Sequence, residues 1–287
     1  MRIAIIGADG QLGSDLVECL GDHTVYPLFF PKLDVRKIEE TRLALRKLPI
    51  DILINTAAYN KVDEAELNPH ECLELNSFSV RNLARVCDEM GYVFVHFSSD
   101  YVFDGKKNSP YTENDHPRPL SIYGVSKLAG EVFVESSGSR YFIIRTCGLF
   151  GKAGSWGKGM NFVDRMLSLG EKKDPVQVVN DQWITPTSTL ELAMNVKDLI
   201  KTSDHGLYHL TNEGQCTWFD FASEIFRLSS LSPELVSVDS EIYGAEARRP
   251  EYSVLDNKRA KEIGLRGFSH WKDALKIYLD TKGRLKI

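Results

Sequence analysis

The sequence lacks any uninterrupted apolar run of about 18 residues, so it predicts no membrane-spanning helix. It also lacks the charged stretch and long apolar run of a signal peptide, because MRIAIIGADG passes directly from a strand-like run to polar residues. Neither sign of charge dominates: the formal net charge of −5 at pH 7 argues against general binding to nucleic acid or to a membrane surface. We therefore expect a cytoplasmic protein.

Cysteine pairs and metal-binding clusters are scarce as well. The five cysteines are odd in number and scattered without the spacing of a zinc site, so we expect them to be reduced. His205 and His209 are four residues apart, but they flank the strand-like run GLYHL and are interpreted as structural. The sequence therefore predicts no metal site.

What the chain does have is an alternation of two kinds of segment. Short runs rich in branched and aromatic residues alternate with amphipathic stretches such as QLGSDLVECL and NSFSVRNLARVCDEM. Continuous apolar strands separated by helices indicate a parallel sheet covered on both faces, which is a Rossmann-like, doubly wound α/β fold. The predicted strands are 2–7, 24–30, 51–57, 92–99 and 141–146.

The alternation loosens after about residue 150 and so divides the chain. We predict a dinucleotide-binding domain over 1–150 and a smaller, interleaved α/β substrate-binding lobe over 151–287. The segment 176–202 is expected to complete the sheet of the first domain. Residues 151–160 contain four glycines and are interpreted as a mobile loop. Because ligands of open α/β sheets bind beyond the carboxyl ends of the strands, we expect a cleft between the lobes.

A glycine-rich motif, GADGQLG, follows the first strand and opens the next helix. Glycine permits a tight turn and lets the backbone approach a pyrophosphate, whose charge is stabilised at a helix N-terminus. The spacing of Gly7, Gly10 and Gly13 is GxxGxxG rather than GxGxxG. The strand–turn–helix setting nevertheless favours dinucleotide binding.

The residues after the second strand usually set the preference between NADH and NADPH. An acid there binds the free ribose hydroxyl, whereas a cation accommodates the 2′-phosphate. The second strand runs into Pro31 and Lys32 without an acid, and Asp34 comes slightly late. Lys32 could meet a 2′-phosphate, so NADPH is favoured over NADH, and NADH stays open.

A serine, a tyrosine and a lysine form the third motif. Ser99 ends the fourth strand, where a hydroxyl faces the expected cleft, and Tyr123 and Lys127 are four residues apart on one helix face. Reduction of a ketone by hydride requires a proton for the developing alkoxide. Tyrosine, with an ordinary pKa near ~10, is a poor acid at pH 7. We expect the lysine cation to lower that pKa and to hydrogen-bond the nicotinamide ribose.

Together these motifs resemble the extended short-chain dehydrogenase/reductases and, within them, the dTDP-4-dehydrorhamnose reductase family. The matching stretches run through nearly the whole chain, and DYVF and the NDQ…PT segment are more specific than the motifs common to the superfamily. These stretches are GADGQLG, NTAAYNKVDEAE, LNSFSVRNLA, SSDYVFDG, YGVSKLAGE, RTCGLFG, NDQWITPT and ARRPEYSVL.

The resemblance implies NAD(P)H-dependent reduction of the 4-keto group of a dTDP-6-deoxy-hexulose. It implies that Ser99 orients the ketone, that Tyr123 donates the proton and that Lys127 assists. Some members bind magnesium at a dimer interface through glutamates. No acidic cluster here can be assigned to that role, so no metal is predicted, while a homodimer is left open.

The resemblance also implies which residues surround the ligands. The implied cofactor-binding residues are Gly7, Asp9, Gly10, Gln11, Leu12, Gly13, Asp34, Val35, Ala57, Ala58, Tyr59, Asn76, Tyr123 and Lys127. The implied substrate-binding residues are Val62, Asp63, Ser98, Ser99, Asp100, Tyr101, Tyr123, Asp181, Gln182, Thr185 and Arg249.

Three residues depart from the family's pattern. Threonine is commoner at position 99, and serine keeps the needed hydroxyl. The usual RTSW is replaced by a run that ends Cys147-Gly148, which removes an aromatic wall from the sugar side of the pocket. Asn60 replaces the usual threonine. The last two bear on the identity of the sugar and leave the catalytic set intact.

Two other functions stay open. A nucleotide-sugar epimerase uses the same Ser/Tyr/Lys set with tightly held NAD, although the DYVF and NDQ segments argue against it. A non-catalytic subunit like the regulatory subunit of methionine adenosyltransferase would keep the cofactor site alone. A 4,6-dehydratase is disfavoured, because it needs an Asp-Glu pair and here Asp100 is followed by Tyr101.

Overall fold

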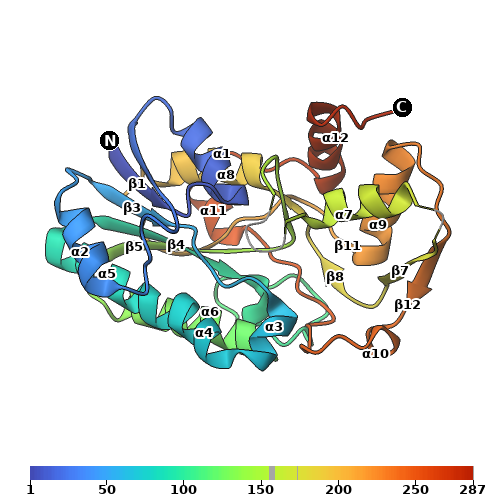
Figure 1. The fold of residues 1–287 in the computed structure, drawn as a ribbon, viewed down its shortest axis with the longest axis horizontal. Coiled ribbons are helices and arrows are strands. Elements are labelled where there is room, and N and C mark those ends of the chain that lie inside the picture. The colour runs from blue at the N-terminus through green and yellow to red at the C-terminus, as the bar shows by residue number, and fades with distance from the viewer. Residues whose placement is uncertain (155–158, 173, 287) are drawn as a thin grey trace.

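A six-stranded parallel sheet forms the centre of the larger lobe in the computed structural model, which describes residues 1–154, 159–172 and 174–286 (Figure 1). Its strand order is β10-β5-β4-β3-β1-β2, which confirms the Rossmann-like, doubly wound fold. All five strands predicted from the sequence belong to it. The strands are β1 (Arg2–Ile6), β2 (Thr24–Leu28), β3 (Ile52–Asn55), β4 (Val93–Ser99), β5 (Arg140–Thr146) and β10 (Gly206–His209).

Helices cover both faces of this sheet, as the continuous apolar strands require. Successive side chains of a strand point to opposite faces, so Ile3 and Ile5 pack on one side and Ala4 and Ile6 on the other. In Figure 1 one group of helices lies above the sheet and the other below it. The first group is α1 (Gln11–Cys19), α8 (Thr189–Leu199) and α11 (Lys258–Glu262), and the second is α2 (Ile38–Arg46), α5 (Ser79–Met90) and α6 (Ile122–Glu135).

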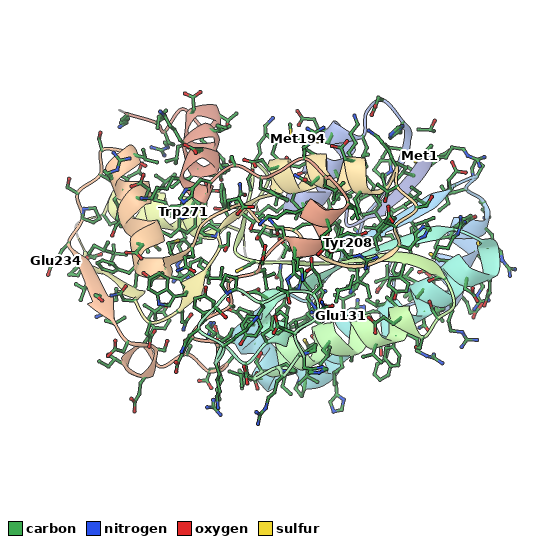
Figure 2. All side chains as sticks on the ribbon, turned by 180° about the vertical axis from the view of Figure 1, so that it is seen from behind. Met1, Glu131, Met194, Tyr208, Glu234 and Trp271 are labelled. Atoms are coloured by element: carbon green, nitrogen blue, oxygen red, sulfur yellow. The ribbon has the colours of Figure 1, made fainter. Side chains whose placement is uncertain are left out.

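The smaller lobe has a separate core, built around Phe221, Leu275 and the large buried ring of Trp271. Figure 2, seen from behind, shows Trp271 in this lobe and Tyr208 and Glu131 in the larger one. Its elements are α7 (Phe162–Gly170), β7 (Val176–Val179), β8 (Trp183–Ile184), β11 (Cys216–Thr217), α9 (Trp218–Leu228), β12 (Leu235–Val238), α10 (Ser240–Tyr243) and α12 (Trp271–Thr281).

The sheet topology corrects the expectation for 176–202. The longest strand of that segment, β7, pairs with β12 in the smaller lobe, and the sixth strand of the main sheet is β10 instead. Only the helix of the segment, α8, joins the larger lobe, where it packs on α1. A four-residue apolar strand suits either sheet, so only pairing in space decides. The division into domains at residue 150 stays a prediction.

The remaining helices and strands are short. In the described part of the chain no helix is long and apolar enough to cross a membrane. Of the predicted glycine-rich loop, residues 155–158 lie outside the described residues. The short elements are α3 (Val62–Leu67), α4 (Pro69–Leu73), the π-helix η1 (Glu74–Phe78), the 3₁₀ helix η2 (Asp100–Val102), β6 (Leu149–Phe150) and β9 (Thr187–Ser188).

Candidate active site

A cleft of about 580 Å³ opens at the carboxyl ends of the strands, where ligands of this fold bind. The glycine motif, the ends of β3 and β4 and the start of α6 form its walls. Phe162 and Trp218 of the smaller lobe close it from the other side. The cleft therefore brings together segments that are far apart in the sequence.

The glycine motif makes the cleft floor suited to a pyrophosphate. Gly7 has φ +75°, and a Cβ there would come within 2.7 Å of the Thr56 Oγ1. A Cβ on Gly13 would overlap the Gly7 carbonyl, so only glycine lets α1 start directly on the turn. Gly10 is the N-cap of α1 and has no side chain that could cap it. The first amides of α1 therefore stay available to an anion.

The cation that lines the cleft beside Asp34 is Arg36, whereas Lys32, which the sequence suggests for a 2′-phosphate, does not line it. Lys32 stands over the Phe29 ring at 5.2 Å and is not among the residues that line the cleft. Arg36 lines it and binds both carboxylate oxygens of Asp34, at 2.9 and 2.7 Å. This contact lowers the pKa of Asp34 and raises that of Arg36. The local chain carries Asp34 and Arg36 into the cleft, and Val35 lies between them.

The segment after β3 forms one wall of the cleft, with Ala57, Ala58 and Tyr59 along it. Asn76 lies behind this wall and is fully buried. Its side chain accepts a hydrogen bond from the Tyr59 amide at 2.8 Å and donates one to the Tyr59 carbonyl at 2.9 Å. Asn76 therefore fixes the backbone of the wall and is not itself one of the residues that line the cleft.

The structure brings Ser99, Tyr123 and Lys127 together, as their spacing predicts. Ser99 ends β4, whereas the other two lie on the first turns of α6 and line the same cleft. Ser121 starts α6 by accepting a hydrogen bond from the Gly124 amide at 3.2 Å. The Lys127 ammonium is buried and donates to the Phe97 carbonyl at 2.6 Å. This bond fixes the lysine against β4.

The pKa values differ from the expectation in one respect. Burial raises the pKa of Tyr123, with a side-chain hydrogen bond to Ser99 as a smaller, opposing effect, so the predicted lowering by Lys127 is wrong for this structure. Burial also lowers the pKa of Lys127 to about 8, against the attraction of Glu131. Lys127 is still mainly a cation near pH 7, but burial is the largest effect on the pKa of Tyr123. Tyr123 consequently stays protonated at neutral pH, as a proton donor must.

Three side-chain oxygens in the cleft indicate that it is built for a polar ligand. Gln11 Oε1, Ser98 Oγ and Thr146 Oγ1 are buried and have no hydrogen-bond partner among the described residues. All three side chains line the cleft. A buried polar atom without a partner is costly, so a ligand that bonded these groups would gain affinity. A dinucleotide and a carbonyl substrate meet this requirement.

Most of the predicted substrate residues fall into two groups, and Asp63 and Thr185 line neither hollow. Val62, Ser98, Asp100 and Tyr101 line the cleft itself, and the Tyr101 ring meets the Tyr123 ring edge-on at 5.6 Å. The predicted residues Asp181, Gln182 and Arg249 line a second hollow of about 1090 Å³. Phe162 and Trp218 border both hollows, which are thus neighbours.

Three of these predicted residues already form hydrogen bonds within the protein, in the absence of any substrate. Asp181 accepts hydrogen bonds from the Ser240 amide at 2.8 Å and the Ser240 hydroxyl at 2.6 Å at the start of α10. Gln182 donates to the same hydroxyl at 2.7 Å. Thr185 is buried and donates to the Gly214 carbonyl at 2.9 Å. Contact of these residues with substrate stays a prediction.

Arginines of the second hollow were missed by the sequence reasoning. Arg165 and Arg248 line it beside Arg249. Arg165 lies on α7, and a single arginine on an amphipathic helix has no signature in the sequence. Arg248 adjoins the matched arginine in ARRPEYSVL, and this doublet was the one available signal.

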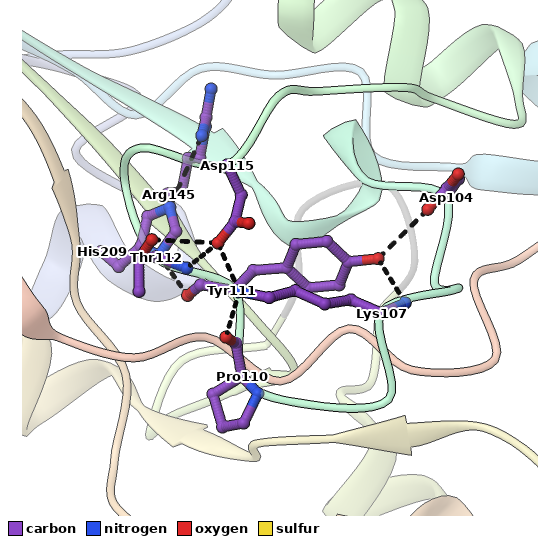
Figure 3. A network of polar contacts seen from close by, with 8 residues as sticks. All are labelled: Asp104, Lys107, Pro110, Tyr111, Thr112, Asp115, Arg145 and His209. Carbon is purple, nitrogen blue, oxygen red and sulfur yellow. Dashed lines mark hydrogen bonds and ion pairs between the residues drawn. The ribbon is translucent and has the colours of Figure 1, made fainter.

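A polar network holds the loop between η2 and α6, and with it the entry to the catalytic helix (Figure 3). The Tyr111 hydroxyl donates to Asp104 at 3.1 Å and accepts from the Lys107 amide at 3.2 Å. His209 Nδ1 lies 3.0 Å from the Tyr111 carbonyl, and its other ring nitrogen is 3.5 Å from Arg145. Burial and Arg145 lower the pKa of His209 to about 3, so this imidazole is neutral and structural.

The part of the chain that the structure describes contains no cluster of side chains suited to bind a metal ion. No group of three or more histidine, cysteine, aspartate or glutamate side chains there could hold a metal ion. The five cysteines are all free thiols.

Comparison with known proteins now decides the family. Residues 1–283 match the family described as RmlD substrate binding domain. The chain belongs to this RmlD family. Membership makes it an RmlD-like nucleotide-sugar reductase, an oxidoreductase that uses a nicotinamide cofactor.

Individual relatives of the RmlD family are similar along their full length. The spore coat polysaccharide biosynthesis protein SpsK of Bacillus subtilis is 36% identical over 98% of both chains. The dTDP-4-dehydrorhamnose reductase of Streptomyces griseus is 37% identical over 96% of this chain and 91% of its own. A crystal structure of dTDP-4-dehydrorhamnose reductase from Bacillus anthracis, in complex with NADP, has a similar fold. Its sequence is 36% identical to this chain, and the two structures superpose with a TM-score of 0.93 over 98% of this chain and 99% of the other.

Proposed function

We propose that this chain reduces the 4-keto group of dTDP-4-dehydrorhamnose, a dTDP-6-deoxy-hexulose, to give dTDP-L-rhamnose. The observation that carries the proposal is the convergence of Ser99, Tyr123 and Lys127 in the cleft that also holds the open N-terminus of α1. Relatives at 36% and 37% identity carry the name dTDP-4-dehydrorhamnose reductase, which supports this substrate.

The residues of the cleft have separate tasks in this reaction. The nicotinamide, when bound, supplies the hydride. Ser99 orients the ketone, and Tyr123, held protonated by its burial, gives a proton to the oxygen that becomes the hydroxyl group. Lys127, fixed to the Phe97 carbonyl, stands where it can hydrogen-bond the cofactor ribose. Closure by Phe162 and Trp218 limits the access of water.

NADPH is the proposed reductant. Arg36 provides a cation that lines the cleft, and we assign it to the 2′-phosphate because its fork suits a phosphate better than an ammonium does. The crystal structure of the Bacillus anthracis relative contains NADP, which supports the choice.

The nucleotide end of the substrate is assigned to the second hollow. Arg165, Arg248 and Arg249 gather there beside the sugar end of the cleft, and a diphosphate needs such cations. The residues predicted from the sequence to bind substrate, Asp181 and Gln182, line the same hollow. The hollow is proposed to hold the dTDP group while the keto sugar reaches Tyr123.

Turnover with defined substrates tests the proposal. Purified protein is mixed with dTDP-4-dehydrorhamnose and either NADPH or NADH, and loss of nicotinamide absorbance is followed, with the product identified by mass spectrometry. Reduction to dTDP-L-rhamnose supports the proposal. If NADPH binds but only another dTDP-4-keto sugar reacts, the named sugar is wrong. If NADPH binds and no such sugar reacts, the result points to another nucleotide-sugar enzyme, such as an epimerase, or to a binding subunit.

A further inference from the structure

Asp100 is a buried carboxyl at the centre of the catalytic group. It directly follows Ser99 and is only 3% exposed. The Ser99 hydroxyl donates to its Oδ1 at 2.9 Å, and the Cys147 thiol donates to its Oδ2 at 3.1 Å. Ser253 also hydrogen-bonds it. Among the described residues no lysine or arginine forms an ion pair with this carboxyl, which is unusual for a buried acid.

This arrangement restricts what Ser99 can do. A serine hydroxyl has one proton, and beside an ionised Asp100, 2.9 Å away, that proton must point to the carboxylate. The Ser99 oxygen accepts from the Tyr101 amide at 3.2 Å and has a side-chain hydrogen bond with Tyr123. As long as Asp100 is an anion, Ser99 cannot turn its proton toward the ketone or Tyr123. If Asp100 is protonated, it donates to Ser99 and the Ser99 proton becomes free.

We propose that Asp100 stores the proton that the reduction consumes and delivers it through Ser99 and Tyr123. This inference rests on the proposed function. When the carbonyl carbon receives the hydride, the new alkoxide oxygen takes the Tyr123 proton, the phenolate takes the Ser99 proton and the serine takes the Asp100 proton. One proton has then left Asp100 and one O–H bond has formed on the product. Asp100 regains its proton from water before the next turnover.

The surroundings of Asp100 favour its protonated form. Burial raises the pKa of Asp100, and its hydrogen bonds oppose this only in part. The titratable groups that face it are Tyr101, Tyr123 and Cys147, and burial raises the pKa of each. All three are therefore neutral near pH 7, and none supplies a positive charge to stabilise a carboxylate. Cys147 stays a thiol and keeps donating to Oδ2.

The pH dependence of turnover gives a direct test. Asp100 can deliver a proton only when its carboxyl is protonated. The wild-type kcat should therefore be highest below the pKa of Asp100 and fall as the pH rises through that pKa. Asp100→Asn cannot release a proton. We expect its kcat to be lower by about 10²-fold, with the alkaline decline lost and the affinity for NADPH, measured by fluorescence titration, unchanged.

Two variants at Cys147 separate a proton store from a structural carboxyl. Cys147→Ala removes a donor from the carboxylate and should move the alkaline decline to higher pH. Cys147→Ser supplies a stronger donor and should move it to lower pH. A residue that only supports the fold would not shift the decline in opposite directions. Circular dichroism and thermal melting first establish that each variant is folded.

Infrared difference spectroscopy measures the protonation state of the Asp100 carboxyl without turnover. The wild-type minus Asp100→Asn spectrum in NADPH-bound protein should show the carbonyl stretch of a protonated carboxyl near pH 7, lost at the pH where kcat declines. A carboxylate signal near pH 7, or a kcat in Asp100→Asn equal to wild type, would overturn the inference. If the wild type reduces no keto sugar, the proposed function fails, and the band alone then decides whether Asp100 holds a proton.

Discussion

Asp63 and Arg249 lie 186 positions apart in the chain and form a two-pronged ion pair, with Nη1 to Oδ1 at 3.0 Å and Nη2 to Oδ2 at 2.7 Å. Asp63 belongs to α3 beside the cleft, and Arg249 borders the second hollow. Arg249 also hydrogen-bonds Tyr101, whose ring contacts Tyr123. One ion pair thus links the proposed nucleotide site to Tyr123, the proposed proton donor.

Disruption of this pair should show in both stability and binding. The Asp63 side chain is 47% exposed, so water weakens the attraction and we expect a coupling of only about 0.5–1 kcal/mol. The measurement is a double-mutant cycle with Asp63→Asn and Arg249→Met in urea unfolding. We also expect a higher KM for the nucleotide sugar in both single variants. A coupling of zero together with an unchanged KM would contradict this role.

Replacement of Tyr123 by phenylalanine removes the proposed proton donor and little else. We expect Tyr123→Phe to bind NADPH as the wild type does and to turn over about 10²–10⁴-fold more slowly, the usual effect of a positioned acid. Steady-state kinetics and fluorescence titration measure the two effects separately. Wild-type turnover in this variant would remove Tyr123 from the mechanism. Tyr92→Phe, remote from the cleft lining, is the matched control.

Lys127 should make the affinity for the cofactor depend on pH. Its cation is present below a pKa of about 8 and is lost as the pH rises through that value. If the cation bonds the ribose, NADPH should bind more weakly above pH 8 and more weakly to Lys127→Ala at every pH. Isothermal titration calorimetry across this range measures both. Equal affinity in wild type and variant would show that Lys127 does not reach the cofactor.

Arg36 should determine the preference between the two cofactors. We expect Arg36→Ala to lose roughly tenfold to a hundredfold in affinity for NADPH, which corresponds to the loss of one charge-assisted contact. Its affinity for NADH should change much less. Lys32→Ala is the matched control, because Lys32 stands over Phe29 and outside the cleft lining. If Lys32→Ala weakens NADPH binding and Arg36→Ala does not, the assignment is reversed.

The sequence by itself predicted five of the six strands of the sheet, the glycine turn and the proposed catalytic set. These depend on local patterns: continuous apolar strands, glycine where no Cβ fits at Gly7 and Gly13, and the four-residue spacing of Tyr123 and Lys127 on one helix face. Each such pattern is encoded within a short stretch of chain, so it can be recognised without any knowledge of the fold.

Only the tertiary structure decided which distant residues act together. The partner of β7, the choice of Arg36 over Lys32 and the pair of Asp63 with Arg249 all depend on chain segments that meet in space. The pKa of Tyr123 is a further example, because a neighbouring lysine alone suggests a fall, whereas burial by both lobes raises it. Burial and long-range contact are properties of the packed chain, and spacing in the sequence does not contain them.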